Sequence, residues 1–191
     1  YKTEGVVLGG YPTGESNKVL YIFTKELGLV YASAQALRNN NSKLRYGLQD
    51  FSHSDIALVR GKSDWKITSA LSVKNLYSTF KEDQRKKEIC ASILVLLKKF
   101  LAGEEKNEEL FIIVMNAFDF LESEEFSKEE LSNFECILVL NILHNLGYVP
   151  HHEEFKKYIN PIWTKELLTH MNGSRIRAVR EINNAISQSH L

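Results

Sequence analysis

Cysteine is nearly absent, since only two of the 191 residues are Cys. Two thiols are too few for a disulfide framework or for a four-cysteine zinc site. Cys90 and Cys136 both stand within apolar helical patterns, EICASILVLL and FECILVL. We therefore expect buried, reduced thiols in a cytoplasmic protein, where free cysteine behaves as a small core residue.

Long apolar runs and catalytic motifs are missing as well. Apolar runs such as residues 93–97 fall far short of the roughly 20 residues that cross a membrane, and the first residues lack the pattern of a secretory signal. There is no GxxxxGK(S/T) phosphate loop, and neither Ser16 nor Ser42 has an evident His/Asp set. We expect no membrane span, no cofactor, no bound metal and no enzymatic activity.

The chain as a whole has no excess of either charge, since it contains 24 Lys and Arg and 24 Asp and Glu. Its two parts, however, differ in net charge. Residues 1–78 contain 10 basic against 6 acidic residues, a net charge of +4, whereas residues 79–191 contain 14 against 18, a net charge of −4. This segregation indicates two modules with different partners.

Period-two alternation runs through the first module and predicts half-buried strands. Gly, Pro and Asn mark turns or loops at residues 9–14, 26–28, 39–42 and 61–64. The pattern predicts five strands, at about 2–9, 17–24, 29–36, 51–60 and 65–74. Five short strands with a longer connection after the third are typical of an OB-type barrel.

Period 3.6 replaces period two from residue 79, which predicts helices. Thr79–Glu82 and Ser127–Glu130 have the pattern of capping boxes, and Asn107 that of an N-cap. The predicted helices cover about 79–102, 107–121, 127–146, 164–172 and 174–187. The fold class is therefore α+β, with an N-terminal five-stranded OB-fold β-barrel over 1–78 and an all-helical C-terminal bundle over 79–191.

Basic residues gather at the strand ends and loops of the predicted barrel, where binding groups are held on a rigid scaffold. They can neutralise phosphates, so a small barrel with a basic rim indicates a nucleic-acid binder. Scattered solvation of surface charges is the alternative. The candidate DNA-binding residues are Lys18, Arg38, Lys43, Arg45, Arg60 and Lys62.

Aromatic residues of the barrel offer rings on which bases can stack. Phe23 and Phe51 are expected to fill the barrel instead, because small barrels are packed by side chains. Tyr46, between Arg45 and Gly47, is the best stacking candidate. The other aromatic candidates are Tyr11, Tyr21 and Tyr31.

The last predicted helix carries Arg175, Arg177 and Arg180 beside an apolar stripe of Ile176, Val179, Ile182 and Ile186. These arginines form either a solvated helix face or a second basic patch for DNA or for an acidic peptide tail. An acidic tail with a terminal hydrophobic residue needs an apolar slot flanked by Lys or Arg. Helices over 79–102 and 129–146, with Lys98 and Lys99 nearby, are candidates for that slot.

Several short motifs follow one another in a fixed order along the chain. They are Thr3-Glu4-Gly5-Val6-Val7-Leu8, Gly14-Glu15-Ser16, Phe23-Thr24, Leu27-Gly28-Leu29-Val30, Arg38, Ser42-Lys43-Leu44, Leu48-Gln49 and Arg60-Gly61, then Phe134-Glu135, Leu140 and Leu146-Gly147-Tyr148-Val149-Pro150. Together they resemble the bacterial recombination mediator family RecO, densely over the barrel and sparsely over the helices.

The resemblance implies an N-terminal OB-fold, a helical C-terminal domain, and binding of single- and double-stranded DNA. It also implies strand annealing, loading of the RecA recombinase together with RecR, and contact with the acidic C-terminal tail of single-stranded-DNA-binding protein. The implied location is the bacterial cytoplasm, in association with the nucleoid. Arg38 becomes the leading DNA contact, because motif and position agree there.

The sequence departs from the family in two places. Many relatives carry four zinc-binding cysteines after the Leu-Gly-Tyr-x-Pro segment, where this chain has HHEEFKKYINPIWTKELLTHMNG. We expect His151, His152 and His170 in this stretch to be ordinary surface histidines. Relatives usually have a basic residue at the position of Gln35 and glycine at that of Ala36, so one DNA contact is expected to be lost.

Two other functions stay open. A scaffold that docks RecR or the single-strand-binding protein, with weak or no DNA binding, would follow if these departures removed the DNA affinity. A metal-dependent nuclease would need ligands that the sequence does not provide.

Overall fold

The computed structural model describes residues 1–39, 42–62 and 64–189. They divide into two compact units, Tyr1–Phe111 and Ile112–Leu191, which are treated separately below. The first unit contains the whole barrel and the helices that directly follow it. The module boundary near residue 78 stays a prediction.

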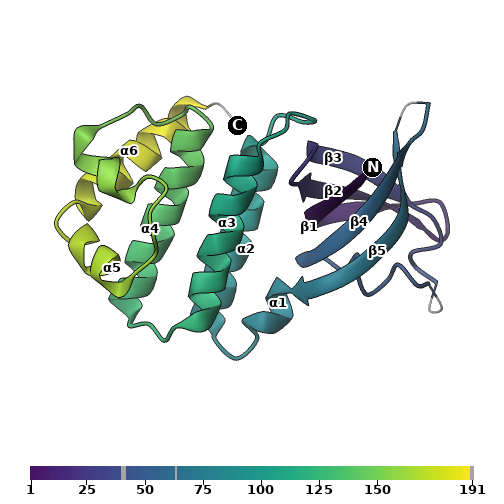
Figure 1. Cartoon of the computed structure of the whole chain (residues 1–191), viewed down its shortest axis with the longest axis horizontal. Coiled ribbons are helices and arrows are strands. Elements are labelled where there is room, and N and C mark those ends of the chain that lie inside the picture. The colour runs from purple at the N-terminus through teal and green to yellow at the C-terminus, as the bar shows by residue number, and fades with distance from the viewer. Residues whose placement is uncertain (40–41, 63, 190–191) are drawn as a thin grey trace. The chain divides into compact units, whose positions relative to one another are not determined.

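Strands in the first unit close into a barrel, shown in Figure 1. They are β1 (Lys2–Thr13), β2 (Asn17–Thr24), β3 (Gly28–Ala34), β4 (Ser52–Arg60) and β5 (Trp65–Asn75). The order around the barrel is β1-β2-β3-β5-β4, and an antiparallel pairing of β1 with β4 closes it. The contact between β3 and β5 is parallel and pairs Ala32 with Trp65 and Ser33 with Lys66. This architecture confirms the predicted OB-type fold.

Alternate residues of each strand fill the barrel, as the period-two pattern requires. Leu20 and Ile22 of β2 are fully buried in the interior, together with Val30 and Ala32 of β3. Each of these positions therefore excludes water from the barrel, and the residues between them face outward. The β2–β3 turn agrees with its prediction, since Thr24 pairs directly with Gly28.

The predicted turn at residues 9–14 is wrong, because β1 continues to Thr13. A register shift between Val7 and Gly9 marks a bulge, and Gly9 has a φ of 128° that few other residues adopt. Pro12 is tolerated because β1 pairs with β4 only as far as Val6 among the described residues, which leaves an edge beyond it. The reversal itself occurs at residues 14–16.

The segment after the second helix packs against the β2–β3 turn. Leu29 N donates to Gly103 O over 2.9 Å, and Lys106 Nζ lies 2.8 Å from a Glu26 carboxylate oxygen. This Lys106 ammonium lowers the pKa of Glu26, first by its hydrogen bond and then by its charge. Gly28 has a φ of 71°, and any Cβ there would overlap the backbone of Glu105. Glycine is thus required at this turn by conformation and by space.

The single helix predicted over 79–102 is two helices in the structure, and its predicted cap is wrong. The capping box at Thr79 is wrong, because Thr79 is the last residue of α1 (Leu76–Thr79) and its hydroxyl donates back to Asn75 O over 3.1 Å. The longer helix α2 (Gln84–Phe100) begins instead at Asp83, whose carboxylate accepts Lys86 N over 3.0 Å. It ends near the predicted position, just before Gly103. The physical reason is that Asn75 and Asp83 are each better N-caps than threonine.

Helices after residue 107 match their predicted caps closely. Asn107 Oδ1 accepts Leu110 N at the start of α3 (Glu108–Ser123), which begins in the first unit and continues in the second. The Ser127–Glu130 capping box is present at α4 (Lys128–Asn145). A short 3₁₀ helix η1 (Glu153–Tyr158), α5 (Lys165–Met171) and α6 (Arg175–Gln188) complete the second unit.

A buried amide ties the segment after α4 to that helix. Asn141 Nδ2 donates to Ile137 O over 2.7 Å and to Tyr158 O over 2.6 Å, while its Oδ1 accepts Asn160 N over 2.7 Å. The first contact lies within α4, and the other two hold the end of η1 and residue 160 against that helix. Side-chain hydrogen bonds thus fix the segment that directly follows α4.

The predicted apolar stripe of α6 is partly wrong. Ala178, Ile182 and Ala185 form its buried face, whereas Ile176 is 81% exposed and Val179 is 38% exposed. Two alanines on this face permit a close approach of α6 to α4, which it contacts. Ile176 and Val179 therefore lie outside the buried face, whereas Ile182 is part of it.

Both cysteines are free and buried, which confirms the prediction. Burial raises the pKa of Cys90 to about 12 and that of Cys136 to about 11, so both stay protonated at neutral pH. Over the described ranges, no helix is both long and apolar enough to span a membrane.

Candidate nucleic-acid interface

The connection between β3 and β4, residues 35–51, carries four of the predicted DNA-binding residues. Its underside is apolar, because Leu37 and Leu48 are buried in the barrel core and Leu44 packs partly against it. The side chains between these leucines are exposed. They are Arg38, Lys43, Arg45 and Tyr46, of which Tyr46 is 75% exposed. Buried leucines therefore seat this segment, which we call the basic loop, and direct its polar residues outward.

Hydrogen bonds join the basic loop to the β1–β2 turn. Arg38 N donates to Ser16 O over 3.0 Å, and Ala36 N donates to Asn17 Oδ1 over 2.9 Å. Ala36 has a φ of 52°, in the left-handed region that favours glycine. Residues 40 and 41 of the predicted polar loop lie outside the described residues.

Lys18 and Arg60 lie outside the basic loop, and each has a carboxylate partner. Lys18 Nζ is 2.9 Å from Asp50 Oδ1. Arg60 Nη1 contacts both Glu104 oxygens at 2.6 and 2.8 Å, and its guanidinium carbon lies 4.8 Å from the Trp65 ring centroid. These pairings, between residues 32 and 44 positions apart in the chain, could not be seen in the sequence.

Lys62 is exposed in the β4–β5 turn, where Gly61 N donates to Asp64 O over 2.7 Å. The predicted hairpin is confirmed by the pairing of Arg60 with Trp65, although Ser63 lies outside the described residues. Ser33 Oγ of β3 donates to Trp65 O over 3.2 Å. The C-terminal end of β3 therefore lies beside this turn and leads directly into the basic loop.

Two aromatic predictions need correction. Phe23 is buried on the outside of the barrel wall, where its ring lies 5.4 Å from that of Phe111. Phe51 is only half-buried, has a φ of 68°, and stacks on Tyr77 with ring centroids 6.5 Å apart. Phe23 faces outward because it alternates with the interior residue Ile22.

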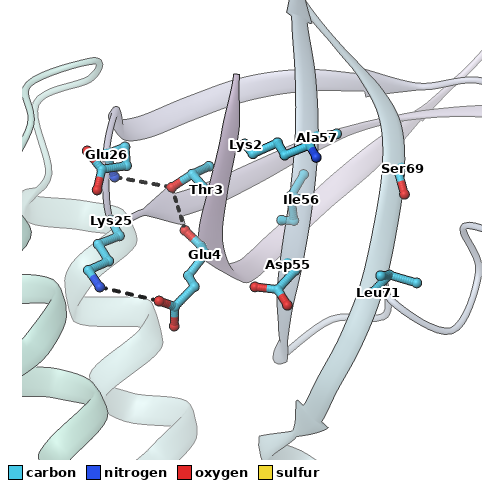
Figure 2. A pocket seen from close by; sticks show the side chains of 10 residues that line it. All are labelled: Lys2, Thr3, Glu4, Lys25, Glu26, Asp55, Ile56, Ala57, Ser69 and Leu71. Carbon is cyan, nitrogen blue, oxygen red and sulfur yellow. Dashed lines mark hydrogen bonds and ion pairs between the residues drawn. The ribbon is translucent and has the colours of Figure 1, made fainter.

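A pocket of about 530 Å³ opens on the outer face of β1, β4 and β5 (Figure 2). Glu4 is one of its lining residues, with Lys25 Nζ at 3.3 Å and His53 Nε2 at 3.2 Å from its carboxylate. Burial lowers the pKa of His53, and the nearby Glu4 carboxylate opposes this in part. The lining also includes the carboxylates of Glu26 and Asp55. Three carboxylates outnumber the two ammonium groups of Lys2 and Lys25 in the lining. The net charge is therefore negative, and this pocket, which sequence patterns did not indicate, is not suited to DNA.

Arg175 and Arg177 both lie on α6 in the second unit. Arg175 lines a groove of about 450 Å³ with Ile176, Val179, Glu129 and Asn172. The Arg177 guanidinium forms an ion pair with Glu154 of η1. The groove thus combines exposed apolar side chains with one arginine and one glutamate, Glu129.

The histidines after α4 are partly or fully exposed. His151 lies 3.5 Å from a Glu153 oxygen, and His152 lies 3.9 Å from Glu181. His170 is exposed on α5. Among the residues that the structure describes, no three His, Cys, Asp or Glu side chains are grouped to hold a metal ion.

A closed five-stranded barrel with an exposed basic loop, followed by helices, defines an OB-type protein. Residues 1–76 match the family model described as Recombination protein O N terminal. This part of the chain is therefore similar to the N-terminal part of the RecO family, which confirms the resemblance.

Curated relatives extend the similarity beyond the barrel. The chain is 31% identical over 151 residues to the DNA repair protein RecO of Alkaliphilus metalliredigens. That alignment covers 78% of this chain and 59% of the relative. It is 27% identical over 150 residues to the DNA repair protein RecO of Thermodesulfovibrio yellowstonii, at 78% and 58% coverage. For Dehalococcoides mccartyi strain BAV1 the identity is 25% over 154 residues, at 81% and 59% coverage. The aligned parts thus span less than two thirds of these relatives.

Proposed function

We propose that this chain is a DNA-binding recombination mediator in DNA repair, which holds single- and double-stranded DNA through the barrel unit. The basic loop is the observation that supports this most directly. Its leucines are buried while Arg38, Lys43 and Arg45 are exposed on the same segment. The relatives named DNA repair protein RecO support the same role.

Binding through this loop is electrostatic. Lysine and arginine neutralise phosphates and release counterions from either a single strand or a duplex, without reading sequence. Tyr46, exposed beside Arg45, adds a ring on which an unpaired base can stack. The protein then has no catalytic step of its own and acts by holding a DNA strand in place at the nucleoid. The held strand can anneal to its complement, or RecA can be loaded onto it together with RecR.

We further propose that the groove on α6 receives the acidic C-terminal tail of single-stranded-DNA-binding protein. Ile176 and Val179 offer apolar surface to a terminal hydrophobic residue, and Arg175 offers a positive charge to an acidic side chain. The slot predicted between residues 79–102 and 129–146 stays a prediction, because α2 and α4 belong to separate units.

The second candidate function is a docking scaffold with weak DNA affinity. It is favoured by the ion pairs of Lys18 with Asp50, of Arg60 with Glu104 and of Arg177 with Glu154. A basic side chain that already forms an ion pair with a carboxylate contributes less free energy to phosphate binding, because that ion pair must be broken or shared. Gln35, neutral where relatives have a basic residue, favours the same candidate.

Fluorescence anisotropy with single-stranded and duplex oligonucleotides at low salt tests the proposal. The variant Arg38→Ala/Lys43→Ala/Arg45→Ala is expected to lose at least about tenfold affinity for both forms. The control Lys81→Ala/Lys87→Ala/Lys128→Ala removes the same charge elsewhere and is expected to bind close to the wild-type level.

Equal affinities of the two variants would contradict the proposal. A pull-down with a synthetic acidic tail peptide separates the alternatives. Capture of the peptide by a protein that binds neither form of DNA would favour the docking scaffold.

A further inference from the structure

Three tyrosines form a ladder of rings on the outside of β1, β2 and β3. The Tyr21 ring centroid lies 5.1 Å from that of Tyr31, nearly at right angles, and 5.9 Å from that of Tyr11. Lys98 of α2 places its ammonium 4.2 Å from the Tyr21 ring centroid. Tyr21 is half-buried, whereas Tyr11 is 48% exposed and Tyr31 is 50% exposed. In this ladder the central ring, Tyr21, is packed between its neighbours, and the two outer rings, Tyr11 and Tyr31, are exposed to solvent.

The ladder occupies the open half of a barrel face whose other half is covered. Phe23 and Leu29, two positions along from Tyr21 and Tyr31, are buried on this same outer face. The barrel interior is filled by the alternate residues of these strands, so the ladder adds nothing to that core. The rings of Tyr11 and Tyr31 are thus exposed to solvent, and each lies beside the ring of Tyr21.

Charge on this open half is basic. Ser33, two residues after Tyr31, pairs with Lys66 of β5, so alternation places Lys66 on the outer face near Tyr31. Lys98 supplies a second ammonium over the central ring. The outward positions on the open half, none of which is a carboxylate, are Tyr11, Val19, Tyr21, Tyr31, Ser33 and Lys66.

We propose that the tyrosine ladder is a stacking platform for the unpaired bases of single-stranded DNA. Tyr11 and Tyr31 would contact bases, Tyr21 would position both rings, and Lys66 and Lys98 would attract the adjoining phosphates. Unpaired bases expose faces that stack on aromatic rings, whereas duplex bases are already stacked on one another. The inference rests on the proposed DNA binding and adds a preference for single strands that the basic loop alone does not give.

The double variant Tyr11→Leu/Tyr31→Leu tests the platform. Its affinity for an oligo-dT strand is expected to fall at least about 30-fold, since each of the two stacked bases contributes about 1–3 kcal/mol, with duplex affinity changed by less than about twofold. The salt dependence of binding should stay the same, because no charge is removed. Tyr11→Phe/Tyr31→Phe keeps both rings and should bind as the wild type does. Tyr77→Leu, which removes another tyrosine that is 50% exposed, is the matched control.

Photo-cross-linking to a strand that contains 5-iodouracil gives an independent measurement on the wild-type protein. Cross-links are expected on Tyr11 or Tyr31, and cross-links confined to other residues would overturn the platform. Undiminished single-strand affinity of the leucine variant, beside normal wild-type binding, would overturn the platform alone. A wild-type chain that binds no DNA would overturn the proposed function and the platform together.

Discussion

Ala36 has a backbone conformation that suits glycine better. Its φ of 52° lies in the left-handed region, where a Cβ costs about 1–2 kcal/mol. The basic loop thus keeps its turn despite the alanine, held by the bond from Ala36 N to Asn17.

We predict that Ala36→Gly stabilises the protein by about 1 kcal/mol, because the strain removed exceeds the entropy that glycine adds to the unfolded chain. For a chain of this length the melting temperature should rise by about 2–4 °C in a thermal scan. Ala57→Gly, in the middle of β4, is the control and should lower it. A lower melting temperature for both variants would contradict the strain at Ala36.

His53 is the buried titratable group with the clearest consequence for pH. Its side chain is 10% exposed, and its Nδ1 has no hydrogen-bond partner within the described part of the chain. Burial lowers its pKa below the ordinary value of 6.5. The folded protein therefore resists a proton that the unfolded chain accepts.

We predict that the free energy of unfolding falls as the pH drops below about 6.5, by at most about 1.4 kcal/mol per pH unit for this one group. The loss stops once the pH is below the folded-state pKa, where both states are protonated. His53→Gln removes the titration, so urea unfolding between pH 7.5 and pH 5 should show a smaller fall in that variant. An identical fall in both proteins would assign the pH dependence to other groups.

At the scale of elements, the β2–β3 turn joins the barrel to the segment after α2. Gly28 and Gly14 both have positive φ, at 71° and 59°, but they differ in surroundings. A Cβ at Gly28 would overlap Glu105, whereas a Cβ at Gly14 would meet nothing within 4 Å. The two glycines therefore separate backbone strain from close packing.

We predict that Gly28→Ala destabilises the protein by about 3 kcal/mol or more, because strain and overlap add. Gly14→Ala should cost only about 1–2 kcal/mol, since strain alone applies. Chemical denaturation of both variants measures the difference. Equal losses would mean that the contact between the turn and residues 101–107 contributes nothing.

Most elements could be predicted from the sequence because their signals are local. Period-two alternation and turn glycines fixed the positions of β2 and β4, and Ser127 fixed the start of α4. The errors arose where two local signals competed, as at Gly9-Gly10, where a bulged strand and a turn share the same residues. At Thr79, a capping pattern lay between two better caps. For α6, the buried face depends on how closely the helix approaches α4. The periodicity of the sequence carries no information on that distance.

At the scale of the whole molecule, charge separation was readable from the sequence, but the partners of individual charges were not. Exposure of Arg38, Lys43 and Tyr46 followed from their place in a polar loop. The pairing of Arg60 with Glu104 joins residues far apart in the chain. The tyrosine ladder likewise needs the registers of three strands, although period two already puts Tyr21 on the outer face.

The central claim is that the basic loop binds DNA phosphates, and the salt dependence of single-strand binding tests it most directly. The logarithm of the affinity should fall linearly with the logarithm of the salt concentration, with a slope of about −0.7 for each phosphate contact. Arg38→Ala/Lys43→Ala/Arg45→Ala should make that slope shallower by about 2, since three contacts are removed. An unchanged slope, or a wild-type chain without DNA affinity at low salt, would contradict the account.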